Sequence, residues 1–359
     1  MKNTPEIERL ISSDSHVGRS HEQVKAHLAT KYHEAYDEAT GMFARRAATG
    51  NAGAQAANMQ RYNHPARGRP GHHDPHARLE DMDIDGVDAE VLYCDVSAYR
   101  YLYKMKDGWQ EGTRAFNDAL VDFASVDPKR LVVSYQIPIH EIDVAVSEVE
   151  RIAELGGKSL QLPVFPNELG FDDYFSERYD PLWSAIQAAD LPICCHIGHN
   201  AALDDLQRRD PTPQNAVMVP MAGLSAGEAL GMWVMTGVLE RFPGLKVVFV
   251  EPGLGWVAWY LYIVDDMATR QKYDLPGLKE LPSFYFHRNV YLTFIEEPDS
   301  VQFLRHRLGV ENIMWSSDYP HPVSSWPNSR KIAEEQTAGL PDHERDLLLA
   351  GNAARVWNL

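Results

Sequence analysis

Eight short apolar runs, each bounded by turn residues, are the feature of this 359-residue sequence that most restricts its fold. Most of them are separated by segments with helical patterning. Several are apolar over nearly their whole length, as parallel strands covered on both faces are. This alternation predicts an α/β fold, a (β/α)8 TIM barrel. The predicted strands are Arg9–Val17, Ala89–Cys94, Leu131–Ile137, Ser159–Val164, Pro192–Ile197, Lys246–Glu251, Asn289–Phe294 and Asn312–Ser317, and the clearest predicted helices are Val144–Leu155, Tyr179–Ala189 and Ser300–Leu308.

Two long stretches interrupt this alternation. Residues 18–76 separate the first two predicted strands by far more than one helix requires, and residues 199–230 follow the fifth strand. Both leave C-terminal strand ends, so we expect the insertion and the long loop to lie over the barrel mouth. With no internal repeat and no low-complexity linker, residues 1–359 are predicted to form a single domain.

Charge and composition exclude several classes of function. A formal net charge of −17 disfavours binding to nucleic acid or to an anionic membrane surface. The longest apolar run, Trp256–Val264, is far shorter than the roughly 20 residues that span a bilayer. The first residues resemble no signal peptide, and the three cysteines have neither metal-site nor disulfide spacing. A cytoplasmic protein that acts on a small molecule is expected.

Four polar residues stand at the ends of predicted strands one, five and eight. Asp14 and His16 are two residues apart and therefore share a strand face, while His196 and Asp318 end the fifth and eighth strands. Each alone has an ordinary structural explanation, such as a capping aspartate or a hydrogen-bonded core histidine. In a closed barrel strand eight adjoins strand one, so the four side chains would converge. They predict a metal site in which Asp318 is both a ligand and a proton shuttle.

The chain also resembles a known group, the second amidohydrolase family, which includes aminocarboxymuconate-semialdehyde decarboxylase and γ-resorcylate decarboxylase. The resemblance rests on SSDSHV, RLEDMDIDGVDAEVLY, FVEPGLGWVAWYL, WSSDYPHPVSSWPNS and GNAARVWNL, in this order along nearly the whole chain. It implies that Asp14, His16, His196 and Asp318 occupy the positions of the metal ligands. It also implies that Asp318 occupies the position of the catalytic acid/base.

Two positions depart from the family pattern. Asp14 stands where these enzymes commonly carry histidine or glutamate, and Glu251 stands where several decarboxylases carry a catalytic histidine. Exchanging nitrogen for hard oxygen shifts the expected ion from zinc toward manganese or iron. If Glu251 and His199 turn inward, they could take part in catalysis or hold a second metal. Glu251 could instead pair with an arginine or cap the helix that starts near Gly255.

Three further residues are candidates for contact with the substrate. Arg61 and His64 lie in the insertion, where a polar loop is more often simply solvated. His321 follows Asp318 so closely that it could also support that carboxylate.

These residues predict a metal-dependent enzyme, either a hydrolase or a non-oxidative decarboxylase (a carboxy-lyase), with one divalent zinc, manganese or iron ion. Its substrate would be a small molecule, aromatic or bearing a carboxylate, and Asp318 would move the proton in either reaction. The sequence does not decide between the two reactions. A dinuclear iron or manganese–iron oxygenase is the alternative, and a non-catalytic barrel is the least favoured one. Family resemblance and the apolar segment near residues 220–240 favour a homodimer.

Overall fold

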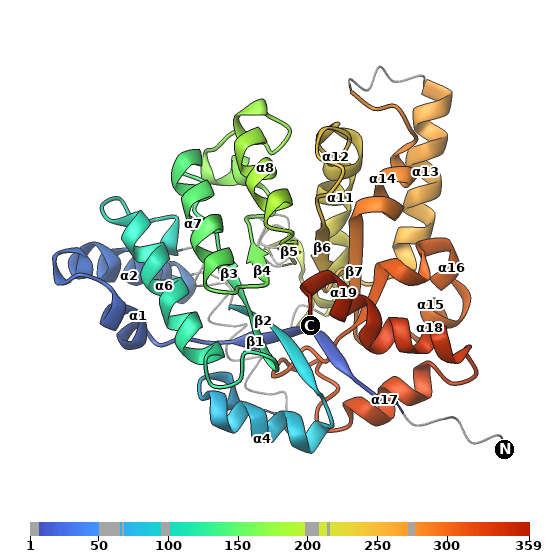
Figure 1. Cartoon of the computed structure of the whole chain (residues 1–359), viewed down its shortest axis with the longest axis horizontal. Coiled ribbons are helices and arrows are strands. Elements are labelled where there is room, and N and C mark those ends of the chain that lie inside the picture. The colour runs from blue at the N-terminus through green and yellow to red at the C-terminus, as the bar shows by residue number, and fades with distance from the viewer. Residues whose placement is uncertain are drawn as a thin grey trace.

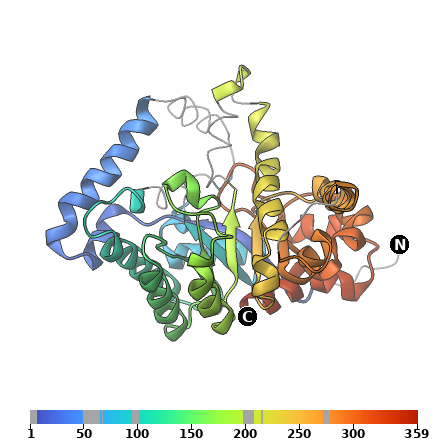
Figure 2. The ribbon, with the colours of Figure 1, turned by 90° about the horizontal axis from the view of Figure 1, so that it is seen from above.

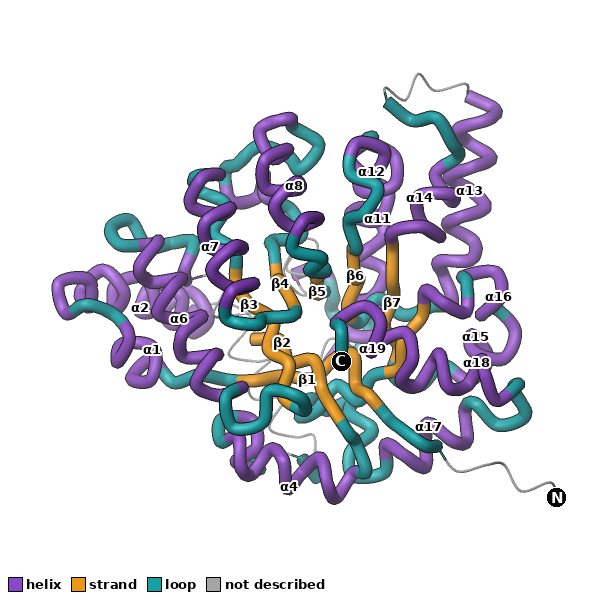
Figure 3. Tube along the Cα trace, in the orientation of Figure 1, coloured by secondary structure: helices purple, strands orange, loops and turns teal. Residues whose placement is uncertain are grey.

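The fold of the chain is a nearly closed barrel of eight parallel strands with helices between them (Figures 1 and 3). The computed structural model describes residues 7–49, 65–66, 68–94, 101–197, 208–213, 216–271 and 277–359. The strands pair in chain order, so the predicted (β/α)8 fold is confirmed. They are β1 Ile11–Val17, β2 Ala89–Cys94, β3 Leu131–Gln136, β4 Ser159–Gln161, β5 Ile193–His196, β6 Val247–Val250, β7 Val290–Phe294 and β8 Ile313–Trp315.

Hydrogen bonds between β1 and the residues after β8 close the barrel. The amide of Asp318 donates to the carbonyl oxygen of Asp14 at 2.9 Å, and the amide of His16 donates to the carbonyl oxygen of Tyr319 at 2.7 Å. The ends of the first and eighth strands are therefore in direct contact, as the sequence predicted.

Helices surround the strands and cover their outer faces (Figure 1). Two of the three helices named from the sequence are found as α7 and α8, whereas Ser300–Leu308 was wrongly predicted as one helix. It divides into α15 and α16 at Leu304, whose φ of −111° departs from helical geometry. The helices are α1 His21–His27, α2 His33–Thr49, α4 Pro75–Asp85, α6 Trp109–Ala124, α7 Ile142–Glu154, α8 Asp180–Ala188, α10 Met218–Met221, α11 Ala226–Met235, α12 Val238–Arg241, α13 Gly255–Gln271, α14 Pro282–Asn289, α15 Pro298–Phe303, α16 Arg305–Leu308, α17 Ser329–Gln336, α18 Asp342–Asp346 and α19 Asn352–Trp357.

The described parts of the two long additions lie on one side of the strands. Figure 2 shows α2 and α10 rising on the same side of the barrel. The end of the insertion is bonded to the end of β1, since the amide of Gly18 donates to the carbonyl oxygen of His72 at 2.8 Å. Among the described residues, no helix has the length and apolar character needed to cross a bilayer. That the chain is a single domain stays a prediction.

Helix α19 packs against the interior of the barrel. Val356 and Trp357 belong to the same buried apolar cluster as Ile11, Val91 and Val248, which fills the space inside the strands. Asn352, at the start of α19, is fully buried. Its Nδ2 donates to the carbonyl oxygens of Val310 and Ile313 at 2.7 and 2.9 Å, which fixes the helix to the start of β8. The GNAARVWNL motif therefore has a structural role.

We expect Asn352→Ala to lower the free energy of unfolding by about 2–4 kcal/mol, because two buried carbonyl groups lose their donor. Urea unfolding followed by circular dichroism measures the effect. The exposed Asn167 provides the control Asn167→Ala, which is expected to change stability little. An unchanged midpoint for Asn352→Ala would contradict this role.

Candidate metal centre

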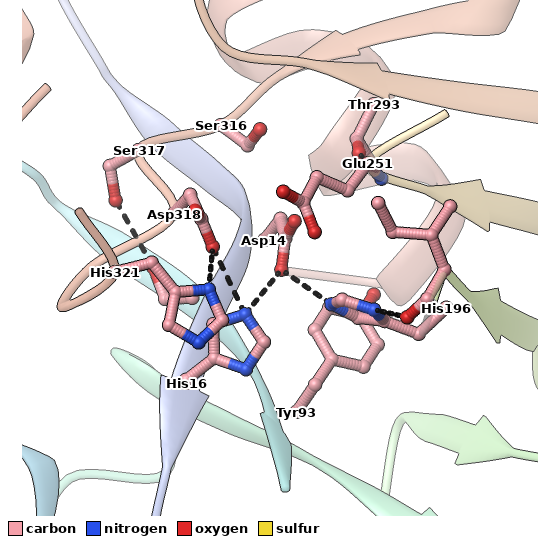
Figure 4. A network of polar contacts seen from close by, with 12 residues as sticks. Asp14, His16, Tyr93, His196, Glu251, Thr293, Ser316, Ser317, Asp318 and His321 are labelled. Atoms are coloured by element: carbon pink, nitrogen blue, oxygen red, sulfur yellow. Dashed lines mark hydrogen bonds and ion pairs between the residues drawn. The ribbon is translucent and has the colours of Figure 1, made fainter. Parts of the chain in front are cut away.

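The four side chains predicted to bind metal meet at the end of the barrel where the strands terminate (Figure 4). Asp14 and His16 point from the same face of β1, and His196 is the last residue of β5. His16 Nε2 lies 3.0 Å from Asp318 Oδ1 and 3.7 Å from Asp14 Oδ1. His196 Nε2 lies 3.4 Å from Asp14 Oδ1. All four side chains are buried.

Glu251 joins this group from the end of β6. One of its carboxylate oxygens lies within 4.8 Å of ligand atoms of Asp14 and Asp318, so the side chain turns inward. The alternative that Glu251 caps the following helix is wrong. Glu297 does so instead, because its carboxylate accepts hydrogen bonds from the amides of Leu254 and Gly255 at the start of α13.

His321 completes the described group. Its Nδ1 lies 2.9 Å from Asp318 Oδ1, and its ring lies against that of His16 in a tilted arrangement with centroids 3.8 Å apart. Its side chain is 34% exposed, whereas Asp318 is fully buried, so His321 lies on the solvent side of the carboxylate. The other candidates, Arg61, His64 and His199, lie outside the described residues.

The backbone is strained where two of these carboxylates are attached. Glu251 and Asp318 have φ of 62° and 52°, in the left-handed region that costs a non-glycine residue roughly 1–3 kcal/mol. Hydrogen bonds hold both conformations. The amide of Glu251 donates to Thr293 Oγ1 at 2.8 Å, and Asp318 is held by the bond from its amide to Asp14. Such strain is typical of functional sites.

Burial of several acidic groups together shifts the pKa values of the centre. Burial, with the nearby carboxylates of Asp318 and Asp14, raises the pKa of Glu251 to about 8. Burial opposes charge on His196, but the Asp14 carboxylate prevails and raises its pKa to about 9. Burial and the adjacent charge of His321 lower the pKa of His16 to about 4. Although burial disfavours the ionised form of Asp318, His321 and His16 hold its pKa well below the usual range.

The residues of this centre fit a divalent cation. Both carboxylate oxygens of Asp14 and Oδ2 of Asp318 are buried, and within the described part of the chain they accept no hydrogen bond. Leaving buried carboxylate oxygens without a donor or a cation is costly. Nδ1 of His196 donates to the carbonyl oxygen of Ile197 at 2.7 Å, which directs Nε2 toward Asp14. The combined imidazole and carboxylate donors suit zinc, manganese or iron.

A buried ion pair behind the centre supports the backbone of His16 and packs against Tyr319, the residue after Asp318. The guanidinium of Arg78 contacts Glu90 Oε2 at 2.5 Å and donates to the carbonyl oxygen of His16 at 2.8 Å. It also lies over the ring of Tyr319, 4.4 Å from the centroid, and the Tyr319 hydroxyl donates to Asp81. No role was assigned to these residues from the sequence. Glu90 could have indicated this ion pair from the sequence, because a charged residue in a buried strand requires a partner.

The sequence profile of the amidohydrolase family matches residues 23–359. The chain belongs to the amidohydrolase family. It is thus an enzyme of the metal-dependent amidohydrolase superfamily, as the sequence predicted.

Relatives of this amidohydrolase include two decarboxylases. 2-Amino-3-carboxymuconate-6-semialdehyde decarboxylase of Dictyostelium discoideum is 23% identical over 290 residues, which are 80% of this chain and 77% of that protein. γ-Resorcylate decarboxylase of a Polaromonas species is 22% identical over 306 residues, 79% of this chain and 86% of that protein.

The barrel is also similar to a solved structure, 5-carboxyvanillate decarboxylase of Novosphingobium aromaticivorans complexed with manganese and 4-hydroxy-3-methoxy-5-nitrobenzoic acid. The two chains align with a TM-score of 0.74 at 17% identity, over 98% of this chain and 96% of the other. At this identity, the likeness concerns the fold.

We expect manganese affinity to rise with pH, by about tenfold per unit between pH 7 and 9 if one proton is displaced. The reason is that a raised pKa, about 9 for His196, leaves this group protonated at neutral pH, and the ion competes with that proton. Titration calorimetry in buffers of different ionisation enthalpy measures both affinity and proton release. Affinity that is independent of pH would contradict the expectation.

We expect Arg78→Met to destabilise the protein by about 3–5 kcal/mol, because the Glu90 carboxylate is left buried without a partner. Arg78→Met combined with Glu90→Leu removes both charges and should recover most of this loss. Manganese affinity should nevertheless stay about tenfold or more lower in the double variant, because the His16 carbonyl group lacks its donor. Thermal unfolding and metal titration separate the two effects. Normal affinity in the double variant would refute a role in positioning His16.

Proposed function

We propose that this amidohydrolase is a metal-dependent, non-oxidative decarboxylase of a small aromatic carboxylate. The observation that carries the proposal is the buried Asp318, which lies beside Asp14 and His16 with an oxygen that accepts no hydrogen bond from described residues. The relatives act on substrates of this kind. Hydrolysis would use the same residues, but the decarboxylase relatives favour the loss of carbon dioxide.

Four side chains would hold the ion, those of Asp14, His16, His196 and Asp318. Asp318 would also transfer the proton to the substrate. A bound divalent ion would supply Lewis-acid chemistry, orienting the carboxylate and neighbouring hydroxyl of the substrate. His321 is a suitable proton source, since the Asp318 carboxylate outweighs burial and raises the pKa of His321 to about 10. Its Nδ1 contacts Asp318 Oδ1 at 2.9 Å.

The proton would pass from His321 through Asp318 to the ring carbon that bears the carboxylate. A bond from hydrogen to that carbon forms, and the bond from the carbon to the carboxylate breaks. The electron pair of the broken bond restores the aromatic ring, and carbon dioxide leaves. The hydrogen bonds that close the barrel between β1 and the residues after β8 fix Asp318 for this transfer, and burial excludes competing water.

We expect Asp318→Asn to lower the rate of decarboxylation by a factor of about 10³ or more, because the amide neither holds nor returns the proton. The assay is carbon dioxide release from 2,6-dihydroxybenzoate by manganese-loaded protein. Elemental analysis of each sample separates loss of the proton carrier from loss of metal. The exposed Asp299 gives the control Asp299→Asn, which should keep the full rate. Undiminished turnover by Asp318→Asn with bound manganese would refute the proposed role.

A dinuclear oxygenase is the second candidate, and the position of Glu251 favours it. Oxygens of Asp14, Glu251 and Asp318 lie within 4.8 Å of one another, a grouping that could hold a second ion beside the first. Two ions per chain, including iron, in protein purified without added metal would favour the oxygenase. One redox-inactive ion would favour the decarboxylase. A homodimeric assembly and a cytoplasmic location stay predictions from the sequence.

A further inference from the structure

A cleft of about 570 Å³ borders the metal centre at Glu251. It lies among the residues that follow β5, β6 and β7, at the same end of the barrel as the four candidate ligands. Glu251 belongs to both the cleft and the metal centre. A substrate bound through the ion would therefore extend into this cleft. This inference rests on the proposed function.

Apolar side chains form most of the cleft lining. Val219, Leu224 and Val323 are 45%, 45% and 50% exposed, although they are large and apolar. They line the cleft together with Trp256 and Phe294. Exposed apolar side chains that gather around a cavity are typical of a surface that binds an apolar ligand.

The wall that carries Val219 and Leu224 is fixed against the backbone that follows Glu251. A Cβ atom on Gly223 would lie 2.4 Å from the carbonyl oxygen of Pro252, so only glycine allows this approach. The segment from residue 219 to 224 therefore lies directly on the strand end that bears Glu251. The apolar wall and the carboxylate belong to one preformed site.

The charges in the described lining have one sign. The acidic residues among the described lining side chains are Glu251, Glu296 and Glu297, and this described lining includes no lysine, arginine or histidine. The N-terminus of α13 could attract an anion, but its amides at Leu254 and Gly255 already donate to Glu297. The helix end is therefore occupied by a carboxylate of the chain itself.

We propose that this cleft binds an uncharged aromatic or apolar part of the substrate and excludes a second carboxylate. An anionic group here would leave water and meet like charges. The substrate then carries one carboxylate, the one oriented at the metal, and the rest of the molecule is neutral.

Two nitrophenols that differ by one carboxylate test this proposal. 4-Hydroxy-3-methoxy-5-nitrobenzoic acid is the compound bound in the Novosphingobium structure, and 2-methoxy-6-nitrophenol is the same compound without its carboxyl group. In both compounds the nitro group and the adjacent phenolate stand in for the carboxylate and hydroxyl that the metal would orient, so the carboxylate of the first compound is the additional anionic group. Binding to manganese-loaded protein is followed by the absorbance of the nitrophenolate, at a pH at which both phenols are ionised. We expect 2-methoxy-6-nitrophenol, which lacks the carboxylate, to bind at least tenfold more tightly than the nitrobenzoic acid, a difference of about 1.4 kcal/mol.

Substitutions at Leu224 test whether the cleft causes this preference. Leu224→Lys adds a cation to the wall and should reduce the preference at least tenfold. Leu224→Gln, of similar size and without charge, should weaken both ligands and leave their ratio unchanged. Equal or tighter binding of the carboxylated ligand, or a ratio that Leu224→Lys does not alter, would overturn the inference.

Metal-free protein separates this inference from the proposed function. If binding of both ligands requires manganese but shows no preference, the cleft inference fails and the proposed function stands. If neither ligand binds in a manganese-dependent manner, the proposed function fails, and the cleft inference fails with it.

Discussion

Closure of the barrel between β1 and the residues after β8 is the constraint on which the whole centre depends. Asp318 and His16 are separated by 302 positions in the chain, yet their side chains contact at 3.0 Å. Two backbone hydrogen bonds across this seam produce the contact, from Asp318 to Asp14 and from His16 to Tyr319. Each bond places a residue of one strand end beside its counterpart on the other. A barrel opened at this seam would keep every residue and lose the site.

The seam brings together groups that repel one another, and the surrounding structure holds them there. Asp14, Glu251 and Asp318 are close enough to share an ion, and two of the three sit on left-handed backbone. Arg78 reinforces the seam from behind, through the carbonyl oxygen of His16 on one strand and the ring of Tyr319 on the other. Favourable folding interactions elsewhere, including the barrel interior, offset this local cost.

The sequence was sufficient to predict features that follow from local pattern and strand order. Eight apolar runs predict eight strands, and the period of a strand places Asp14 and His16 on one face. Contacts between distant positions were beyond such reasoning. Glu297 caps α13 from more than 40 residues away, so Glu251 was left with two possible roles. Arg78 likewise takes its role from a partner on β2, and neither helical nor strand periodicity indicates that pairing.

Charge balance links the metal centre to the cleft. With Asp14, Glu251 and Asp318 all ionised, a bound divalent ion would leave an excess of one negative charge, which a protonated His321 beside Asp318 would neutralise. A substrate carboxylate at the ion then restores a negative charge, so a second anionic group would enter an already negative site. A protonated Glu251 would offset one charge, and burial raises its pKa to about 8, in the direction this requires. Because Glu251 belongs to both the metal centre and the cleft, its protonation would affect metal binding and substrate charge together.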